Sequence, residues 1–184
     1  MLERLKKRYP YQMSCAQHWT CATAILSRLP IVTGLAARNH NLVPPIAWAR
    51  IDASARGLGQ VTVVGTHVFR PTRNPHVHAL QMRALAQMIA QTSGPIVLAG
   101  DLNAGGWSAS FRGLLRTTGL VPMAAFLPTW PAAPRVAPQV ALDHILVSPD
   151  LRIGRSGIGP ATGSDHLPVV ADIHARSTAH VSSR

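Results

Sequence analysis

The chain has 184 residues, of which 47% are hydrophobic and 14% are charged. This length favours a single domain, and this composition excludes an intrinsically disordered chain. The longest apolar runs, such as PIVLA, are too short to span a membrane, and no apolar segment of the kind found in signal peptides follows the basic N-terminus. The sequence as written therefore predicts a soluble globular protein.

The formal net charge is +11, from 18 Lys and Arg against 7 Asp and Glu. This excess favours a phosphorylated substrate or a polyanionic partner such as nucleic acid. It is a weak indication, because the arginines are scattered and only RLKKR (4–8) forms a cluster, which a solvated helix face would explain equally well. Cys15 and Cys21 are too few for a disulfide framework, and we expect two free thiols.

The spacing of apolar residues predicts an α/β chain with more strand than helix. The expected strands, in chain order, are 21–27, 45–53, 60–68, 95–101, 141–148 and 167–175. Helices are expected over 75–91 and 108–118, and Ser108 and Gly119 have the residue types that begin and end the second helix. The Pro-rich segment 130–139 reads as a surface loop, so we expect one domain over 1–176 and a flexible tail over 177–184.

Polar residues stand at the ends of four of these strands. His67 follows VVGT, Asp101 and Asn103 follow PIVLAG, Asp143 opens DHILVS, and Asp165 and His166 precede LPVV. A single such residue is more often a cap or a buried, hydrogen-bonded group than a catalyst. The accumulation is more informative, because three of the seven acidic residues fall in these short motifs. The pattern favours a catalytic site built at strand ends.

The spacing within each motif limits the chemistry. Asp101 and Asn103 are two residues apart and share one face of an extended segment, so Asp101 can activate a water while Asn103 contacts a phosphoryl oxygen. Asp165 and His166 are neighbours and point apart, so SDH is not a Ser-His-Asp triad, and the sequence has no G-x-S-x-G motif. Asp165 is better interpreted as a metal or water ligand, and His166 as a cation paired with Asp143.

The motifs GTH, GDLNA, TWP, LDHILVS and GSDHLPVV, in this order, resemble the endonuclease/exonuclease/phosphatase superfamily over nearly the whole chain. The resemblance implies a four-layer α-β-β-α sandwich, two packed mixed β-sheets with helices outside. It also implies hydrolysis of phosphate esters with Mg²⁺ or Mn²⁺. By the matching motifs, the catalytic residues are His67, Asp101, Asn103, Asp143 and His166, and Asp165 lies at the metal site.

One departure from the family concerns its first elements. The family has an asparagine-bearing strand and a Gln-Glu motif whose glutamate holds the metal, both upstream of the position of RYPY (8–11). The single glutamate here is Glu3, which lies close to RYPY and matches a surface helix of the family. We therefore expect the fold to be incomplete at its N-terminus. We expect the 184-residue chain alone to aggregate, bind metal weakly and turn over little substrate. A longer chain with those elements is expected to stay in solution, bind metal and turn over substrate.

Several alternatives remain open at this stage. The substrate can be DNA, RNA, a phospholipid headgroup or a small phosphoester. Two other functions compete with phosphoester hydrolysis: binding of phosphate-containing ligands by a weakly active remnant of the family, and binding of nucleic acid without catalysis. The oligomeric state and compartment are undetermined, and one option is the soluble part of a membrane-anchored or exported bacterial protein. The other histidines lack zinc-site spacing and are expected at the surface: His18, His40, His76, His78, His174 and His180.

Overall fold

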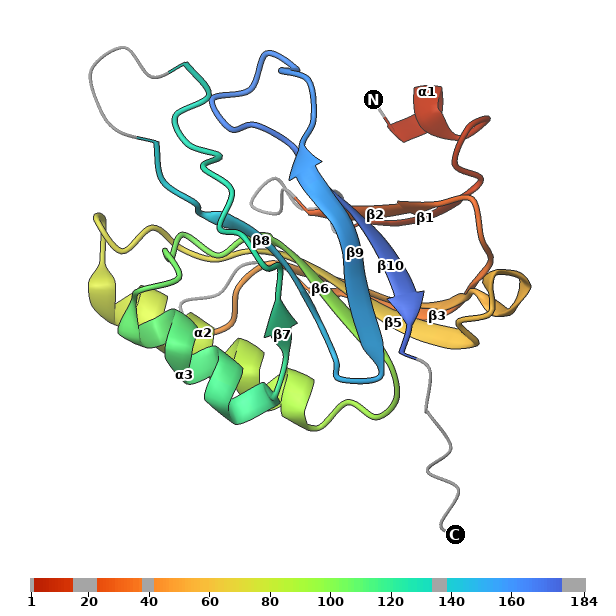
Figure 1. The fold of residues 1–184 in the computed structure, drawn as a ribbon, viewed down its shortest axis with the longest axis horizontal. Helices are drawn as coiled ribbons and strands as arrows, with labels where there is room; N and C mark the ends of the chain where they lie inside the picture. The colour runs from red at the N-terminus through yellow and green to blue at the C-terminus, as the bar shows by residue number, and fades with distance from the viewer. Residues whose placement is uncertain (1, 15–22, 38–41, 134–138, 177–184) are drawn as a thin grey trace, which may run out of the picture.

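The computed structural model describes residues 2–14, 23–37, 42–133 and 139–176 (Figure 1). In chain order the elements are α1 (Leu2–Leu5), β1 (Tyr11–Ser14), β2 (Ala24–Ser27), β3 (Ile31–Ala37), β4 (Ile46–Asp52), η1 (Ser54–Arg56), β5 (Gln60–His67), α2 (Pro75–Ala90), β6 (Ile96–Asp101), α3 (Ala109–Thr118), β7 (Val121–Pro122), β8 (Asp143–Val147), β9 (Leu151–Ile158) and β10 (Val169–Ala175). Cys15, Cys21, His18, His40 and the predicted tail 177–184 lie outside the described residues.

The central element is a mixed six-stranded sheet with the strand order β3-β4-β5-β6-β8-β7. Its pairs are antiparallel except for β5 and β6, which are parallel and are joined by the crossover helix α2. Two antiparallel pairs, β1 with β2 and β9 with β10, form separate two-stranded sheets. In Figure 1, helices α2 and α3 lie together beside the central sheet, and β9 and β10 cross it.

The hydrophobic core lies on both faces of the central sheet, because successive strand residues point to opposite sides. Leu98 and Leu146 pack into a cluster with residues of α2 and α3. Their neighbours Val97 and Val147 pack into a second cluster with Leu151 of β9. A third cluster joins β4 to Ile25 of β2. The layered α/β sandwich predicted from the sequence is therefore the fold observed.

Local sequence signals position the two long helices. Asn74 caps α2 by accepting hydrogen bonds from the backbone N–H groups of His76 and Val77. Ser108 accepts from the N–H of Phe111, and α3 ends at Gly119 in a left-handed conformation, as the sequence predicts.

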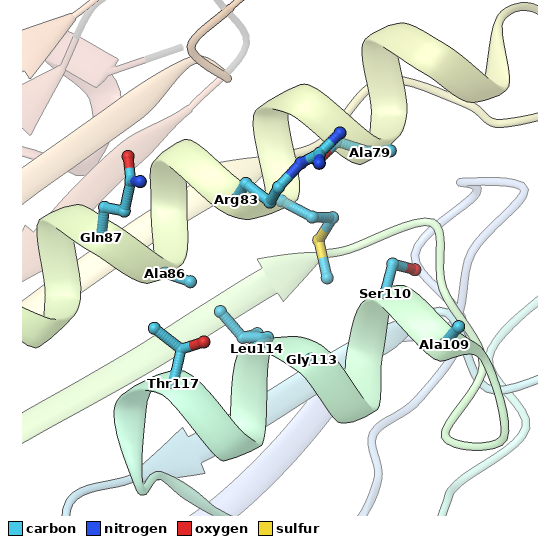
Figure 2. Close-up of a pocket in the computed structure, with 10 residues that line it drawn as sticks. Ala79, Arg83, Ala86, Gln87, Ala109, Ser110, Gly113, Leu114 and Thr117 are labelled. Atoms are coloured by element: carbon cyan, nitrogen blue, oxygen red, sulfur yellow. The ribbon is translucent and has the colours of Figure 1, made fainter.

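A groove of about 500 Å³ runs between α2 and α3 (Figure 2), lined by Ala79, Met82, Arg83, Ala86, Gln87, Ala109, Ser110, Gly113, Leu114 and Thr117. None of the candidate site residues lines it.

Each of the six predicted strands contains an observed strand within its bounds, and both predicted helices are present. The strands β1, β3, β7 and β9 were not predicted. The strand β9 carries Arg152, Arg155, Gly154 and Gly157, and most of its residues are exposed, so it lacks the apolar alternation of a half-buried strand. No helix in the described part of the chain has both the length and the apolar character needed to cross a membrane.

Gly100 is expected to be the glycine least tolerant of substitution in the central sheet. Its φ is 147°, and a Cβ there would overlap the backbone of Thr66 on β5. Gly100→Ala should lower the free energy of unfolding by more than about 3 kcal/mol, because strain and overlap add. Gly113→Ala in α3, with only the distant end of Arg116 nearby, should instead stabilise by roughly 0.5–1 kcal/mol. Urea denaturation of both variants tests this, and equal effects would contradict it.

Candidate phosphoesterase site

Asp101 ends β6 and is held by the tight turn that follows it. Its Oδ1 accepts a hydrogen bond from the Asn103 backbone N–H at 2.8 Å, and its Oδ2 accepts from the Asn103 side-chain amide at 3.1 Å. The same amide donates to the Val68 carbonyl at 2.9 Å. Asn103 has a φ of 47°, a left-handed conformation that asparagine tolerates better than most residues. The pair predicted from the sequence is therefore one hydrogen-bonded unit.

His67 lies beside Asp101 because their strands pair in register. The parallel ladder of β5 and β6 places the two residues directly opposite each other. The Nε2 of His67 is 3.5 Å from Oδ2 of Asp101. The His67 side chain is 43% exposed whereas that of Asp101 is 11% exposed, so the imidazole can contact both the carboxylate and a ligand in solvent.

Asp143 and His166 form the shortest ion pair of the site. Asp143 opens β8 opposite Asp101 in the antiparallel ladder. Its Oδ2 lies 2.7 Å from Nδ1 of His166, and because a carboxylate accepts, Nδ1 carries the proton of this hydrogen bond. The other ring nitrogen, Nε2, is 3.9 Å from Oδ2 of Asp101. The Oγ of Ser164 accepts from the backbone N–H of His166 and fixes this turn. The pairing of Asp143 with His166 expected from the family resemblance is present.

The electrostatics of the group centre on Asp101. Burial raises the pKa of its carboxyl, and the nearby charge of Asp143 raises it further. The hydrogen bond from the Asn103 backbone N–H and the two imidazoles, His67 and His166, act in the opposite direction and lower the pKa, but burial is the largest effect. A carboxyl with a raised pKa binds a proton more readily, which suits a group that accepts one from water.

Three side chains of the described residues could hold a metal ion together. Asp101, Asp143 and His166 each offer one ligand atom, and these atoms lie within 4.8 Å of one another. Asp165, the residue predicted to lie at the metal site, is exposed and stands outside this group. Its backbone carbonyl accepts a hydrogen bond from Ala132 at 2.8 Å. Its role as a ligand stays a prediction. Glu3 is exposed on α1, 4.0 Å from Lys6, and is not part of the group.

Two cavities border the site. One, of about 480 Å³, includes His67 and Asp101 and is walled by Thr23 and by the β2 residues Ala24, Ile25 and Leu26. The other, of about 260 Å³, includes Asn103 and His166 and is lined further by Arg70, Pro71, Thr72, Trp130, Val140 and Leu142. The ring of Trp130 stands 6.5 Å from that of His166. Trp130 and Arg70 thus line the cavity beside His166, and the sequence reasoning did not assign them to the site.

The prediction that all the remaining histidines are surface residues is wrong for His78. His76 and His174 are exposed as predicted, but His78 is only 5% exposed. Its Nε2 lies 3.2 Å from the carbonyl oxygen of Leu102. His144, the second residue of the motif DHILVS, is 3% exposed, and its Nε2 lies 2.8 Å from the carbonyl oxygen of Ala104. The signal available for the burial of His78 was its helical spacing in α2. It lies three and four residues before Gln81 and Met82, so it shares their face of the helix.

The titration of Asp101 is expected to separate it from other carboxyls in the metal-free chain. Its midpoint should lie above that of an ordinary aspartate, because burial raises the pKa of its carboxyl. Asp52 provides the opposite control, because hydrogen bonds from Ser54 lower the pKa of its carboxyl. A carbon-detected NMR titration of side-chain carboxyls measures both. A midpoint for Asp101 at or below that for Asp52 would contradict the prediction.

Comparison with known proteins identifies relatives of this chain. The sequence profile of the Endonuclease/Exonuclease/phosphatase family matches residues 2–166. Among solved structures, an endonuclease/exonuclease/phosphatase from Beutenbergia cavernae DSM 12333 is similar, with 22% identity and a TM-score of 0.68, over 83% of this chain and 47% of that one. The chain thus spans about half the length of that relative. Comparison with curated proteins found no match.

Two further structures share the fold. A sphingomyelinase C from Streptomyces griseocarneus is 20% identical with a TM-score of 0.65, over 92% of this chain and 79% of that one. A beta toxin variant from Staphylococcus aureus with bound magnesium ions is 20% identical with a TM-score of 0.63, over 92% and 80% of the two chains. Because the family profile matches most of the sequence, this chain belongs to the endonuclease/exonuclease/phosphatase family.

Proposed function

We propose that this chain hydrolyses phosphodiesters with a divalent metal ion, using Asp101 as the base. Membership of the family supports metal-dependent hydrolysis of phosphate esters in general. The observation that carries the finer proposal is the position of the Asp101 carboxylate, which has Asn103 hydrogen-bonded to it and the Nε2 atoms of His67 and His166 at 3.5 and 3.9 Å. A carboxylate and two imidazoles thus lie close together, which supports a role in accepting the proton of water and in binding the phosphoryl oxygens.

The reaction we propose is attack by a water molecule on phosphorus. Asp101 accepts a proton from the water as its oxygen forms a bond to phosphorus, and the ester P–O bond opposite to it breaks. The leaving alkoxide takes a proton from solvent or from His166. The phosphoryl oxygens gain negative charge in the transition state, and His67 and His166 would donate hydrogen bonds to them. Asn103, whose side-chain amide donates to Val68 and Asp101, would hold the base in position. Asp143 holds the His166 ring with Nε2 directed to the site.

The donor atoms present fit a hard divalent cation. Asp101 and Asp143 are opposed on neighbouring strands, and the charge of Asp143 raises the pKa of Asp101, so a cation nearby would relieve their repulsion. We place Asp165 at the ion as well, because Mg²⁺ is usually held by one or two carboxylates together with substrate phosphate. Mn²⁺ accepts the same oxygen ligands and tolerates imidazole. When bound, the ion would supply charge neutralisation of the phosphoryl oxygens.

The substrate's organic group has a natural location in the cavity beside His166. Trp130 and Leu142 give that cavity apolar walls, and Arg70 adds a cation. The net charge of +11 favours anionic substrates in general. A phosphodiester with an apolar or flat substituent fits these features, and this class includes nucleic acids and phospholipid headgroups. The second candidate function is phosphate binding without efficient turnover, which is favoured by the position of Asp165 outside the three-residue group.

Substitution of the proposed base and of its partner histidine should abolish turnover but not folding. Asp101→Ala and His166→Ala should each lower kcat for bis-p-nitrophenyl phosphate by roughly 10²–10⁴, because both groups act in the transition state. His174→Ala, at an exposed residue of β10 away from the site, is the matched control and should be unchanged. Parent-like rates in either site variant would exclude the assignment. Phosphate binding without turnover in the parent chain would favour the second candidate function.

Metal removal and Asp165 give an independent test. Chelation should abolish turnover, and Mg²⁺ or Mn²⁺ should restore it. Asp165→Asn should raise the Mg²⁺ concentration needed for half-maximal rate by about tenfold or more, since loss of groups that hold an ion typically has at least this effect. Asp172→Asn, which removes an exposed carboxylate paired with Arg155, is the control. An unchanged Mg²⁺ requirement in Asp165→Asn would remove Asp165 from the metal site.

A further inference from the structure

We propose that His78 and His144 are positioning residues that hold the turn carrying Asp101 and Asn103 from two sides, an inference that rests on the proposed function. His78 comes from α2 and His144 from β8, and both rings are buried. Their Nε2 atoms contact the carbonyl oxygens of Leu102 and Ala104, the residues immediately before and after Asn103.

The chemistry of these contacts fixes which ring nitrogen carries a proton. A carbonyl oxygen can only accept a hydrogen bond, so Nε2 of His78 and Nε2 of His144 must each be the donor. Burial lowers the pKa of both imidazoles, more than the surrounding carbonyls and the carboxylates of Asp101 and Asp143 raise it. Both rings are therefore neutral near neutral pH, and each makes its contact with a single N–H group.

The turn needs such support because its conformation is uncommon. Asn103 is the one non-glycine residue with positive φ among the described residues, and such a conformation persists when the surrounding structure fixes it. Leu102 is fully buried, and its N–H donates to the Leu142 carbonyl at 3.0 Å. Without the two imidazoles, the carbonyls of Leu102 and Ala104 would lose their buried donors, at a cost that favours another turn conformation.

Each histidine also anchors the turn to a different part of the core. The His144 ring packs against Phe111 of α3 with centroids 4.6 Å apart, and Phe126 approaches it at 6.0 Å. His78 lies on the buried face of α2 next to Gln81, whose Oε1 accepts from the backbone N–H of Phe69 at 2.9 Å. Movement of α2 or α3 would therefore be transmitted to Asn103, the residue whose amide bonds Asp101.

The test compares glutamine with leucine at each histidine. The Gln side-chain amide reaches nearly the position of imidazole Nε2 and can donate to the same carbonyl, whereas Leu fills the space without a donor. His78→Leu and His144→Leu should each lower kcat for bis-p-nitrophenyl phosphate by roughly 10–100-fold, as loss of groups that orient site residues commonly does, with KM nearly unchanged. His78→Gln and His144→Gln should recover most of this loss. His76→Leu, at an exposed residue on the same helix, should match the parent.

A second measurement does not depend on turnover. In the parent chain the Asn103 side-chain amide donates to Val68 and Asp101, so its NMR signals should be protected from solvent exchange. The two Leu variants should shift these signals and speed their exchange, and the Gln variants should not. The double Leu variant should lose little more than the larger single loss, because both rings hold one turn.

The outcomes separate this inference from the proposed function. Leu variants with a lower Tm but with parent kcat and parent Asn103 signals would overturn the inference, since the rings would then be core packing alone. If the parent chain shows no turnover, the proposed function fails, and the Asn103 signals decide the inference by themselves. Altered signals in the Leu variants and restored signals in the Gln variants support it, and unaltered signals overturn it.

Discussion

The site depends on the register of three neighbouring strands, because β5 and β6 end, and β8 begins, at the same edge of the sheet. The ladders place His67 opposite Asp101 and Asp101 opposite Asp143. Side chains alternate along each strand, so these three residues share the face of the sheet that Val97 and Val147 also occupy, away from α2 and α3. A slip of one residue in either ladder would turn a site residue toward the helices and an apolar residue toward the site.

The opposite face of the same strands supports the site from behind. Gly100 and His144 are paired in the ladder one step from Asp101 and Asp143, and they point to the helix layer. Gly100 allows β5 to approach closely, and His144 donates to the carbonyl of Ala104. The end of the site face that carries Asp101 and Asp143 is thus polar and partly exposed, whereas His144 on the opposite face is buried. The buried contacts behind the strand explain how the Asp101 carboxyl, whose pKa is raised by burial, is kept in one position.

The sequence was sufficient to predict the elements that alternate clearly and to select candidate site residues that the structure brings together, whose chemical roles stay predictions. The strands β5, β6 and β8 and both long helices have strong local signals, and the GDLN and SDH motifs are specific. The burial of His78 follows the helical spacing of Met82 and Leu85, but its contact with the Leu102 carbonyl was not predictable locally, because Leu102 is 24 residues away. The strands β3 and β9 were missed because Gly34 and the arginines of β9 interrupt their apolar pattern. Because Asp165 and His166 are adjacent, their side chains are expected to point in different directions. The sequence does not predict which of the two side chains lies near Asp101; in the structure it is His166.

The contacts that complete the site connect distant parts of the chain, and this has a consequence for biosynthesis. Asn103 bonds Val68 across 35 residues, His144 bonds Ala104 across 40, and Asp143 meets His166 across 23. Contacts of such separation form late, after the entropy of closing long loops has been overcome. On the ribosome, His166 emerges after all the other site residues. A nascent chain can therefore order its central sheet while the ring that faces Asp101 is still inside the exit tunnel, so the Asp143–His166 pair forms only after the central sheet has left the ribosome.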